Sequence, residues 1–272
     1  MFINGIFLKG RLFAAWIGIF AAIGAWAHVR SVLAYTSSEA NTIAVYDAVA
    51  ASVVNITTEI CEPEFFFCSV PSESGSASGI VLREDGTIVT NHHVVSAARA
   101  IQVTVADGRR LKGRLIASSP VDDMAIIRVD VGDRPLRAIR IGDSASLKVG
   151  EKVLAIGNPF GLGQSLSVGT VSMLNRDIKK DGLVLRNLIQ TDAAINPGSS
   201  GGAMVNSRAE LVGMNTIILS PTGSSIRIGF AIPVNRIQKI APGLMHAWER
   251  WAGWILATLL VLWVGRRIYR FR

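Results

Sequence analysis

The chain has 272 residues, half of them hydrophobic, and a formal net charge of +8 at pH 7. All of the excess lies at the two ends, because residues 1–30 and 250–272 carry basic residues and no acid, while the middle is neutral. A nucleic-acid binder would carry its basic patch on the folded domain, so this distribution excludes that class and is typical of the ends of membrane segments.

Residues 1–34 contain the first hydrophobic segment. An uncharged run over residues 12–27 follows Lys9 and Arg11. A basic start and an apolar run occur both in signal peptides and in signal anchors. The run is long for the hydrophobic part of a signal peptide and short for a complete span. The segment is therefore either a cleaved signal peptide or an anchor, and export of the following domain is expected in both cases.

The two cysteines, Cys61 and Cys68, lie close together in CEPEFFFC. They are too few and wrongly spaced for a zinc site, so no metal is expected. In an exported chain they predict a local disulfide, which would stabilise the fold by about 2–3 kcal/mol in the chain-entropy model. Two free thiols are the alternative. No cofactor is expected either, since the glycine-rich GNPFGLGQ lacks the lysine and Ser/Thr of a phosphate loop.

Short β-branched runs separated by turn signals fill the middle of the chain, after a short amphipathic helix over Glu39–Val54. Two groups of about six runs are separated by a connection near Asp130–Gly150, and no βαβ alternation is present. This pattern predicts an all-β fold of two packed six-stranded antiparallel barrels, barrel one at about residues 50–132 and barrel two at about 148–235. The expected strands are Val53–Ile60, Gly79–Arg83, Thr87–Thr90, Ile101–Val105, Leu111–Ile116, Ala125–Val129, Lys152–Ile156, Ser165–Met173, Leu188–Thr191, Leu211–Leu219 and Ile226–Ile232.

The C-terminal part begins with a short helix expected from Pro233 to about Leu244. Residues 248–265 are then predicted to be a transmembrane helix and residues 266–272 a basic cytoplasmic tail. The uncharged stretch Trp251–Gly265 has fifteen residues. As a helix it spans about 22 Å, less than the ~30 Å hydrocarbon core, but flanking tryptophans and arginines compensate for such a mismatch. A helix packed on the protein surface is the alternative.

The stretch QTDAAINPGSSGG, residues 190–202, places Ser200 between glycine-containing turns. A serine nucleophile must be held on a tight turn beside a base, and backbone N–H groups must point at the developing oxyanion. Glycine permits both arrangements. An ordinary Gly/Ser loop between two strands is the alternative for this segment alone.

A histidine and a carboxylate occur in suitable contexts elsewhere. His92 and His93 follow the expected strand Thr87–Thr90, and Asp122 and Asp123 precede another strand of the same half. A buried carboxylate can orient an imidazole and stabilise it once it is protonated. With histidine and aspartate in barrel one and serine in barrel two, the site is expected in the cleft between the barrels.

The sequence resembles the trypsin-like protease domain of the HtrA/DegP family of exported serine proteases over most of residues 45–240. The resemblance is carried by SGSASGIVLREDGTIVTNHHVV, DDMAIIRV, AIGNPFGLGQSLSVGTVS, QTDAAINPGSSGGAMVN and IGFAIP. It implies barrels of the chymotrypsin/trypsin type and a protease domain over residues 35–240. It also implies a catalytic triad of His93, Asp123 and Ser200, with His92 a variable neighbour and Asp122 a surface residue.

The resemblance further implies that the N–H groups of Gly198 and Ser200 form the oxyanion hole, with Ser199 where the family usually has asparagine. It places the specificity pocket beside Ala194, Ile195 and Ile228. Because no acid stands at Ala194, small or medium apolar residues are expected before the scissile bond, rather than Arg or Lys. Some family members carry a disulfide in the loop where Cys61 and Cys68 lie.

Family members usually continue into one or two PDZ domains, whereas this sequence passes from IGFAIP into the C-terminal hydrophobic segment. Activation through a PDZ domain is therefore not expected, and the trimer common in the family stays open, because membrane anchoring offers another way to hold the domain. We expect a serine endopeptidase tethered to the lipid bilayer of the inner or plasma membrane, with its catalytic domain on the periplasmic side, that cleaves unfolded or accessible polypeptides. The alternatives are a protease-fold binding or chaperone-like module and a scaffold for envelope assembly.

Overall fold

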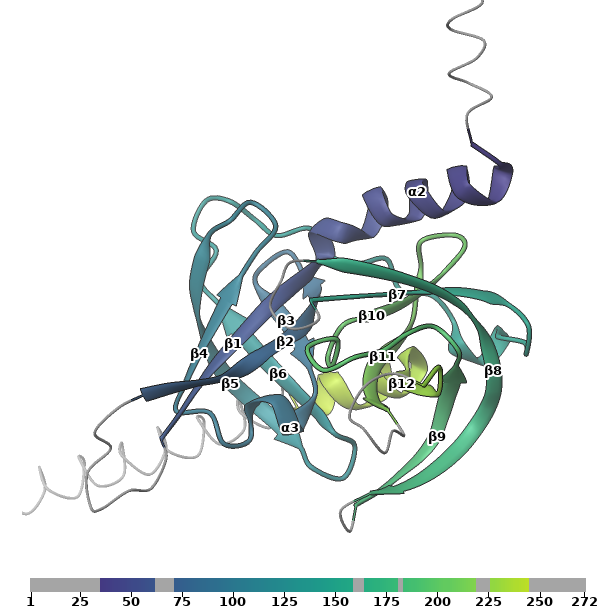
Figure 1. Cartoon of the computed structure of the whole chain (residues 1–272). Helices are drawn as coiled ribbons and strands as arrows, with labels where there is room; N and C mark the ends of the chain where they lie inside the picture. The colour runs from purple at the N-terminus through teal and green to yellow at the C-terminus, as the bar shows by residue number, and fades with distance from the viewer. Residues whose placement is uncertain (1–34, 62–70, 159–163, 181–182, 219–225, 245–272) are drawn as a thin grey trace, which may run out of the picture. The chain divides into compact units, whose positions relative to one another are not determined.

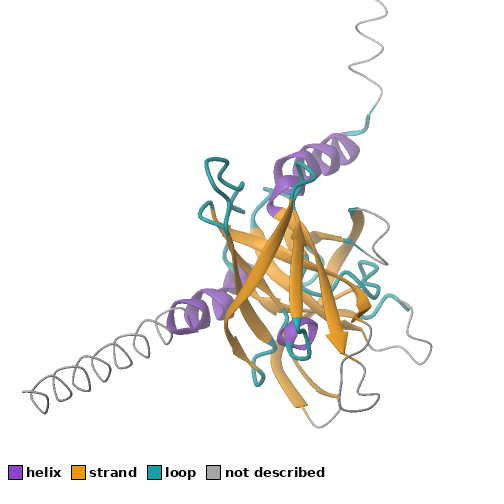
Figure 2. Cartoon of the chain, turned by 90° about the vertical axis from the view of Figure 1, so that its left-hand side faces the viewer, coloured by secondary structure: helices purple, strands orange, loops and turns teal. Residues whose placement is uncertain are grey.

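The computed structural model describes residues 35–61, 71–158, 164–180, 183–218 and 226–244. Strands dominate this part of the chain, and its helices are short (Figure 2). The strands form two closed antiparallel barrels, with the orders β1-β2-β3-β6-β5-β4 and β10-β11-β12-β9-β8-β7 (Figure 1). The prediction of an all-β fold with two six-stranded barrels is confirmed.

Each barrel is built from a continuous part of the sequence. In barrel one the elements are β1 (Val53–Cys61), β2 (Pro71–Arg83), β3 (Thr87–Thr90), α3 (His92–Val95), β4 (Ala100–Thr104), β5 (Arg110–Ser119) and β6 (Met124–Val129). In barrel two they are β7 (Lys152–Gly157), β8 (Ser165–Lys180), β9 (Leu183–Thr191), β10 (Ala203–Asn206), β11 (Leu211–Ile218) and β12 (Gly229–Pro233). The 3₁₀ turn η2 (Ser144–Ser146) lies in the connection between the barrels, and a helical segment over residues 234–244 follows β12.

Several strands of barrel one are buried on both faces. In β6, Ala125, Ile127 and Val129 fill the interior of barrel one, while Met124 and Ile126 belong to a larger cluster shared with barrel two. Successive side chains of a strand point to opposite faces, so a strand buried on both sides is apolar at every position. This explains why the runs in the sequence are continuous rather than alternating.

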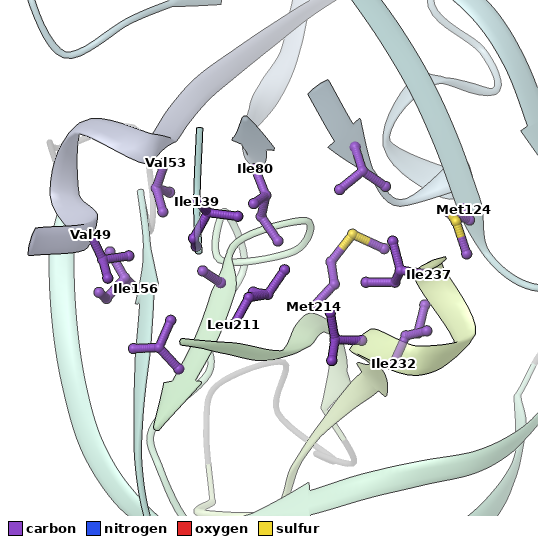
Figure 3. Packing of buried hydrophobic residues seen from close by; sticks show 14 of the residues in the cluster. Val49, Val53, Ile80, Met124, Ile139, Ile156, Leu211, Met214, Ile232 and Ile237 are labelled. Carbon is purple, nitrogen blue, oxygen red and sulfur yellow. The ribbon is translucent and has the colours of Figure 1, made fainter. Parts of the chain in front are cut away.

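The shared cluster holds the two barrels together (Figure 3). Val53 and Ile80 enter it from barrel one, and Ile156, Leu211 and Ile232 enter it from barrel two. Protein interiors are packed as densely as organic crystals, and such a contact resists sliding. Any side chains that face each other across the boundary between the barrels are therefore held in a fixed relation.

The N-terminal helix begins earlier than the sequence predicts. The structure has α2 at Ser37–Val49 and a 3₁₀ turn, η1, at Ala50–Ser52, where we expected a short amphipathic helix that starts at Glu39 and leads into a strand. A capping box explains the early start, because the Thr36 hydroxyl accepts from the Glu39 N–H at 3.2 Å and the Glu39 carboxylate accepts from the Thr36 N–H at 2.7 Å. At the other end β1 begins at Val53, as the sequence predicts, and this side chain packs in the shared cluster.

Barrel two departs from the predicted strands at positions where the backbone is irregular. Asn175 and Asn187 both have positive φ and lie at register shifts between β8 and β9, which obscures the continuation of this long hairpin in the sequence. Arg227 also has positive φ, so β12 begins at Gly229 and not at Ile226. The sequence analysis missed β10 entirely, because its four residues follow directly on Gly201–Gly202 and read as part of that turn.

Several sequence predictions fall outside the described residues. No helix within the described ranges is long and apolar enough to cross a membrane. The segments predicted for that role lie within residues 1–34 and 245–272, which the structure does not describe. The predicted pairing of Cys61 with Cys68 also involves residues outside the described part, and it stays a prediction.

Asp122 links barrel one to the helical segment after β12. Its Oδ1 accepts from Arg236 Nε at 3.0 Å and Nη2 at 2.5 Å, and its Oδ2 accepts from the Ser119 hydroxyl at 2.6 Å. The two ion-pair side chains are only 20% and 23% exposed. Asp122, expected to be a surface residue, is partly buried and ion-paired, and the sequence analysis did not foresee this pair because the partner lies 114 positions later in the chain.

Replacing Asp122 with alanine should lower the free energy of unfolding by about 1–3 kcal/mol, because a partly buried guanidinium and a hydroxyl would lose a charged partner. Urea unfolding at pH 7 measures the change. Asp133→Ala, at an exposed aspartate of the same half, is the matched control and should change stability by less than about 0.5 kcal/mol. Equal effects of the two substitutions would contradict a stabilising role for the Asp122–Arg236 pair.

Candidate active site

His93 lies in α3, the short helix that follows β3. Asn91, which is completely buried, stands at the N-cap position, and its Nδ2 donates to the carbonyl of Asp123 at 3.1 Å. Asp123 directly precedes β6, which pairs with β3, so the sheet register brings the two loops side by side. The side chain of His93 is 47% exposed and is open to a ligand.

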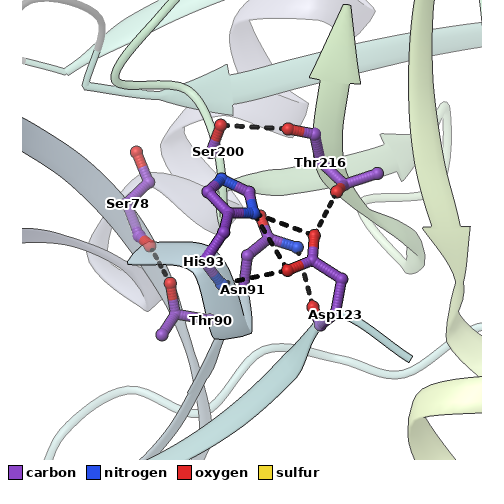
Figure 4. Close-up of polar contacts among 7 residues, drawn as sticks. All are labelled: Ser78, Thr90, Asn91, His93, Asp123, Ser200 and Thr216. Atoms are coloured by element: carbon purple, nitrogen blue, oxygen red, sulfur yellow. Dashed lines mark hydrogen bonds and ion pairs between the residues drawn. The ribbon is translucent and has the colours of Figure 1, made fainter. Parts of the chain in front are cut away.

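The carboxylate of Asp123 faces the imidazole of His93. His93 Nδ1 lies 2.9 Å from Oδ1 and 3.0 Å from Oδ2, and the backbone N–H of His93 donates to Oδ1 at 3.1 Å (Figure 4). A carboxylate only accepts hydrogen bonds, so Nδ1 must carry the proton. In a neutral ring the lone pair is then on Nε2, the nitrogen needed for a general base.

Asp123 is held ionised although its side chain is only 3% exposed. Burial by itself raises the pKa of this carboxyl, but the hydrogen bonds from His93 and Thr216 outweigh burial and keep the pKa below its ordinary value. The backbone of Asp123 has φ of +50°, a region that aspartate tolerates better than most residues. The hydrogen bond from Asn91 to its carbonyl helps to hold this conformation.

Thr216, in β11 of barrel two, joins the candidate residues across the boundary between the barrels. Its hydroxyl donates to Asp123 Oδ2 at 2.6 Å, and its carbonyl accepts from the Ser200 hydroxyl at 3.0 Å. The sequence analysis did not single out Thr216. A threonine within an apolar strand carries no motif, and only the packing of the two barrels brings its hydroxyl to the carboxylate.

Ser200 follows a tight turn formed by Asn196–Ser199. The Ser199 N–H donates to the Asn196 carbonyl at 2.9 Å, Pro197 occupies the second position and Gly198 the third, with φ of +94°. Proline then glycine with positive φ is the signature of a type II turn. The backbone of Ser199 supports the turn from both sides, because its carbonyl also accepts from the Gly202 N–H at 3.0 Å.

The serine segment lies directly against barrel one at Gly201. A Cβ added to this glycine would lie 2.2 Å from the Ser78 carbonyl oxygen and 2.2 Å from the Thr90 hydroxyl, so no side chain fits. The N–H groups of Gly198 and Ser200 donate to no other atom in the part of the chain that the structure describes.

The structure brings His93 and Asp123 into direct contact and connects Ser200 to them through Thr216. In Figure 4 the imidazole ring is drawn between Asp123 and Ser200, with one ring nitrogen on each side. The Ser200 hydroxyl itself is directed to the Thr216 carbonyl, and rotation about its side-chain bond would be needed to reach His93. Hydrogen bonds of catalytic groups are often loose before a substrate binds.

The residues expected around the specificity pocket differ in exposure. Ala194 is exposed and its N–H donates to the Ser167 hydroxyl at 2.7 Å. Ile195 is 1% exposed and occupies the space beside Gly229, where a Cβ would meet it at 2.8 Å. Ile228 is partly buried and packs against the shared cluster. Within the described ranges, no group of three or more His, Cys, Asp or Glu side chains is arranged to hold a metal ion.

The family that the chain matches covers the part of the sequence that contains His93, Asp123 and Ser200. Residues 77–214 match the family described as the trypsin-like peptidase domain. The chain is similar to Protease Do-like 1, chloroplastic, of Arabidopsis thaliana, with 41% identity over 213 residues that cover 77% of this chain and 48% of the relative. It is also similar to the periplasmic serine endoprotease DegP of Escherichia coli (strain K12), with 46% identity over 62% of this chain and 35% of the relative. The chain thus spans about half or less of the length of these curated relatives.

The chain is also similar to solved structures of HtrA-type proteases. The HtrA-type protease AlgW with tripeptide is similar, with a TM-score of 0.66 and 35% identity over 76% of this chain and 63% of the other. The HtrA-type protease AlgW with decapeptide has a TM-score of 0.65 and 33% identity over 74% of this chain and 66% of the other. The similarity supports the chymotrypsin/trypsin type expected for the two barrels.

Replacing Thr216 with valine should lower stability in a pH-dependent way. The hydroxyl stabilises the carboxylate form of Asp123, whose pKa is lowered in the folded state. Such a contribution is complete above the unfolded pKa of about 3.9 and is lost as the pH falls through the lower folded value. The free energy of unfolding should therefore differ from wild type by about 1–3 kcal/mol at pH 7, and the difference should become much smaller once the pH lies below the lowered folded pKa of Asp123.

The matched control is Thr191→Val, because the Thr191 hydroxyl is buried and donates to a carbonyl, that of Thr170. Its effect on stability should be the same at both pH values. Denaturant unfolding of the three proteins across this pH range measures both effects. A pH-independent loss in Thr216→Val would contradict the role assigned to its hydroxyl.

Proposed function

The chain belongs to the trypsin-like peptidase family, and on this premise we propose that it is a serine endopeptidase that uses His93, Asp123 and Ser200. The observation that carries the proposal is the contact of the buried Asp123 carboxylate with Nδ1 of His93 at 2.9 Å. The imidazole of His93 is 47% exposed, and Asp123 contacts its Nδ1 and not its Nε2. An ion pair with a purely structural role would not need this exposure. The glycine turn that presents Ser200 supports the same assignment.

In the proposed reaction the Ser200 oxygen attacks the carbonyl carbon of a peptide bond, and Nε2 of His93 takes the serine proton. Asp123 keeps Nδ1 protonated and stabilises the imidazolium that forms. The negative oxygen of the tetrahedral intermediate accepts from the N–H groups of Gly198 and Ser200. His93 then returns the proton to the leaving amine, and a water activated by His93 hydrolyses the acyl-enzyme.

The proposed substrates are unfolded or otherwise accessible polypeptides. The solved relatives described as holding a tripeptide and a decapeptide support a polypeptide ligand. An acid at the base of the pocket would select Arg or Lys, and Ala194 provides none. On this ground we propose a preference for small or medium apolar residues before the scissile bond.

A second candidate function is a binding or chaperone-like module that does not cut. One observation favours it, namely that the Ser200 hydroxyl donates to the Thr216 carbonyl and not to His93. In this alternative the serine would stay in that arrangement when a polypeptide binds. A fluorophosphonate probe separates the two functions, because only a serine activated by its base reacts with the probe.

Ser200→Ala and His93→Ala should each lower kcat for casein cleavage by about 10⁶-fold, and Asp123→Asn should lower it by about 10⁴-fold. The two alanine substitutions should also abolish fluorophosphonate labelling of the protein. His92→Ala is the matched control, at the neighbouring histidine of the same helix, and should retain most of the activity. Dependence on His92 in place of His93 would refute the assignment.

We further propose that the protease domain is tethered to a membrane and lies on its periplasmic side. The support is the distribution of charge, with basic residues before residues 12–27 and after residues 251–265 and a neutral domain between them. The positive-inside rule then places both ends of the chain in the cytoplasm. The description of a relative, DegP, as periplasmic agrees with this side for the domain.

A fusion of alkaline phosphatase after Arg272 should be inactive in this topology, because the enzyme folds only outside the cytoplasm, and a fluorescent protein fused there should fluoresce. As the control, phosphatase fused after Leu244 should be active. An active phosphatase after Arg272 would show that the C-terminal segment does not span. Retention of a protein truncated after Leu244 in the membrane, once a cleavable signal replaces residues 1–34, would contradict tethering by the two segments.

A further inference from the structure

Ser78 is a buried serine of β2. Its hydroxyl, N–H and carbonyl form hydrogen bonds with residues of both barrels near the candidate site. It is completely buried. Its hydroxyl donates to the Gly198 carbonyl at 2.7 Å and accepts from the Asn158 N–H at 2.8 Å. Its backbone N–H donates to the Ser200 carbonyl at 2.9 Å. One residue of barrel one therefore contacts the carbonyls on both sides of the nucleophile segment of barrel two.

These contacts restrict the part of the chain that carries the proposed oxyanion donors. Gly198 has no side chain to limit its backbone, and its φ of +94° is one of several conformations open to glycine. The Ser78 hydroxyl fixes the direction of the Gly198 carbonyl, and the Ser78 N–H fixes that of Ser200. Each carbonyl shares a planar peptide unit with the N–H of the next residue, so the two contacts fix the Gly198–Ser199 and Ser200–Gly201 peptides. The peptides that carry the N–H groups of Gly198 and Ser200 adjoin these two, and their freedom to turn is thereby restricted, which reduces reorganisation during the reaction.

Ser78 also connects this segment to the part of barrel one that carries His93. The Ser78 carbonyl accepts from the Thr90 hydroxyl at 2.7 Å (Figure 4), and Thr90 ends β3, directly before the helix of His93. Gly201 packs on the same two groups with no room for a side chain. A rotation of the Ser78 hydroxyl would give up two hydrogen bonds at once, since its single proton and one of its two lone pairs are in use.

We propose that Ser78 is a positioning residue that holds Gly198–Ser200 in the conformation that receives the oxyanion, in register with the base on barrel one. This inference rests on the proposed peptidase function. Ser78 does not touch the reacting atoms and acts through the backbone of Gly198 and Ser200. Its effect should therefore fall on the transition state and leave the binding of substrate almost unchanged.

The test compares the full-length wild type with Ser78→Ala, using a peptide substrate and a peptide boronic acid, which forms a tetrahedral adduct with an active serine. Loss of the hydroxyl should lower kcat by about 10–100-fold through misplacement of the donors. KM should change less than about twofold, and affinity for the boronic acid should fall by the same factor as kcat/KM. The pH of half-maximal activity should not move, because the His93–Asp123 contacts are untouched.

Ser76→Ala is the matched control, two residues earlier on β2, where the hydroxyl donates to Asn55 Oδ1 at 3.2 Å within barrel one. It should leave kcat and boronic acid affinity unchanged, while Ser78→Cys, which keeps a weak donor of similar size, should recover part of both. Two outcomes would overturn the inference, both measured well below the unfolding temperature. The first is an unchanged kcat in Ser78→Ala or Ser78→Cys, and the second is a shift of the pH of half-maximal activity. If Ser78→Ala does not fold, as seen by circular dichroism, Ser78→Cys decides. A wild type that neither cleaves peptides nor reacts with a fluorophosphonate would instead refute the proposed function.

Discussion

The candidate site depends on the hydrogen bonds that the buried carboxylate of Asp123 accepts. It accepts from the ring and the backbone of His93 in barrel one and from the Thr216 hydroxyl in barrel two. A carboxylate removed from water without such partners would be strongly disfavoured, so the fold must supply all of them together. The backbone of Asp123, with its φ of +50°, is held by the hydrogen bond from Asn91 Nδ2 to its carbonyl.

Apolar packing and polar contacts have different tasks at the boundary between the barrels. The shared cluster, to which Ile80, Met124 and Ile156 belong, provides the hydrophobic burial that holds the halves together without directional preference. The hydrogen bonds of Ser78 and Thr216 provide direction, since they select one arrangement of the serine segment against barrel one. Because Gly201 has no side chain, the serine segment can approach barrel one closely enough for the apolar packing and the hydrogen bonds to form together.

The sequence was sufficient to predict the two barrels, because runs of β-branched residues and turn signals are local properties of the chain. It was also sufficient to choose His93, Asp123 and Ser200 as candidates, since each lies in a recognisable motif. It did not reveal Thr216 or the ion pair of Asp122, because their contacts join positions that are far apart in the chain and carry no local pattern. The irregular positions Asn175 and Asn187 were missed for a local reason. Each interrupts the alternating pattern of a strand, and the strand predictions relied on that pattern.

The division of the site between two barrels has a consequence for a chain that is still being synthesised. The strands of barrel one, together with His93 and Asp123, are complete at Val129, whereas Ser200 lies between β9 and β10 of barrel two and is added later. Thr216, which stabilises that carboxylate, is translated after Ser200, and Arg236 comes later still. A chain synthesised only as far as barrel one therefore carries His93 and Asp123 but neither Ser200 nor Thr216, so it would lack the proposed site.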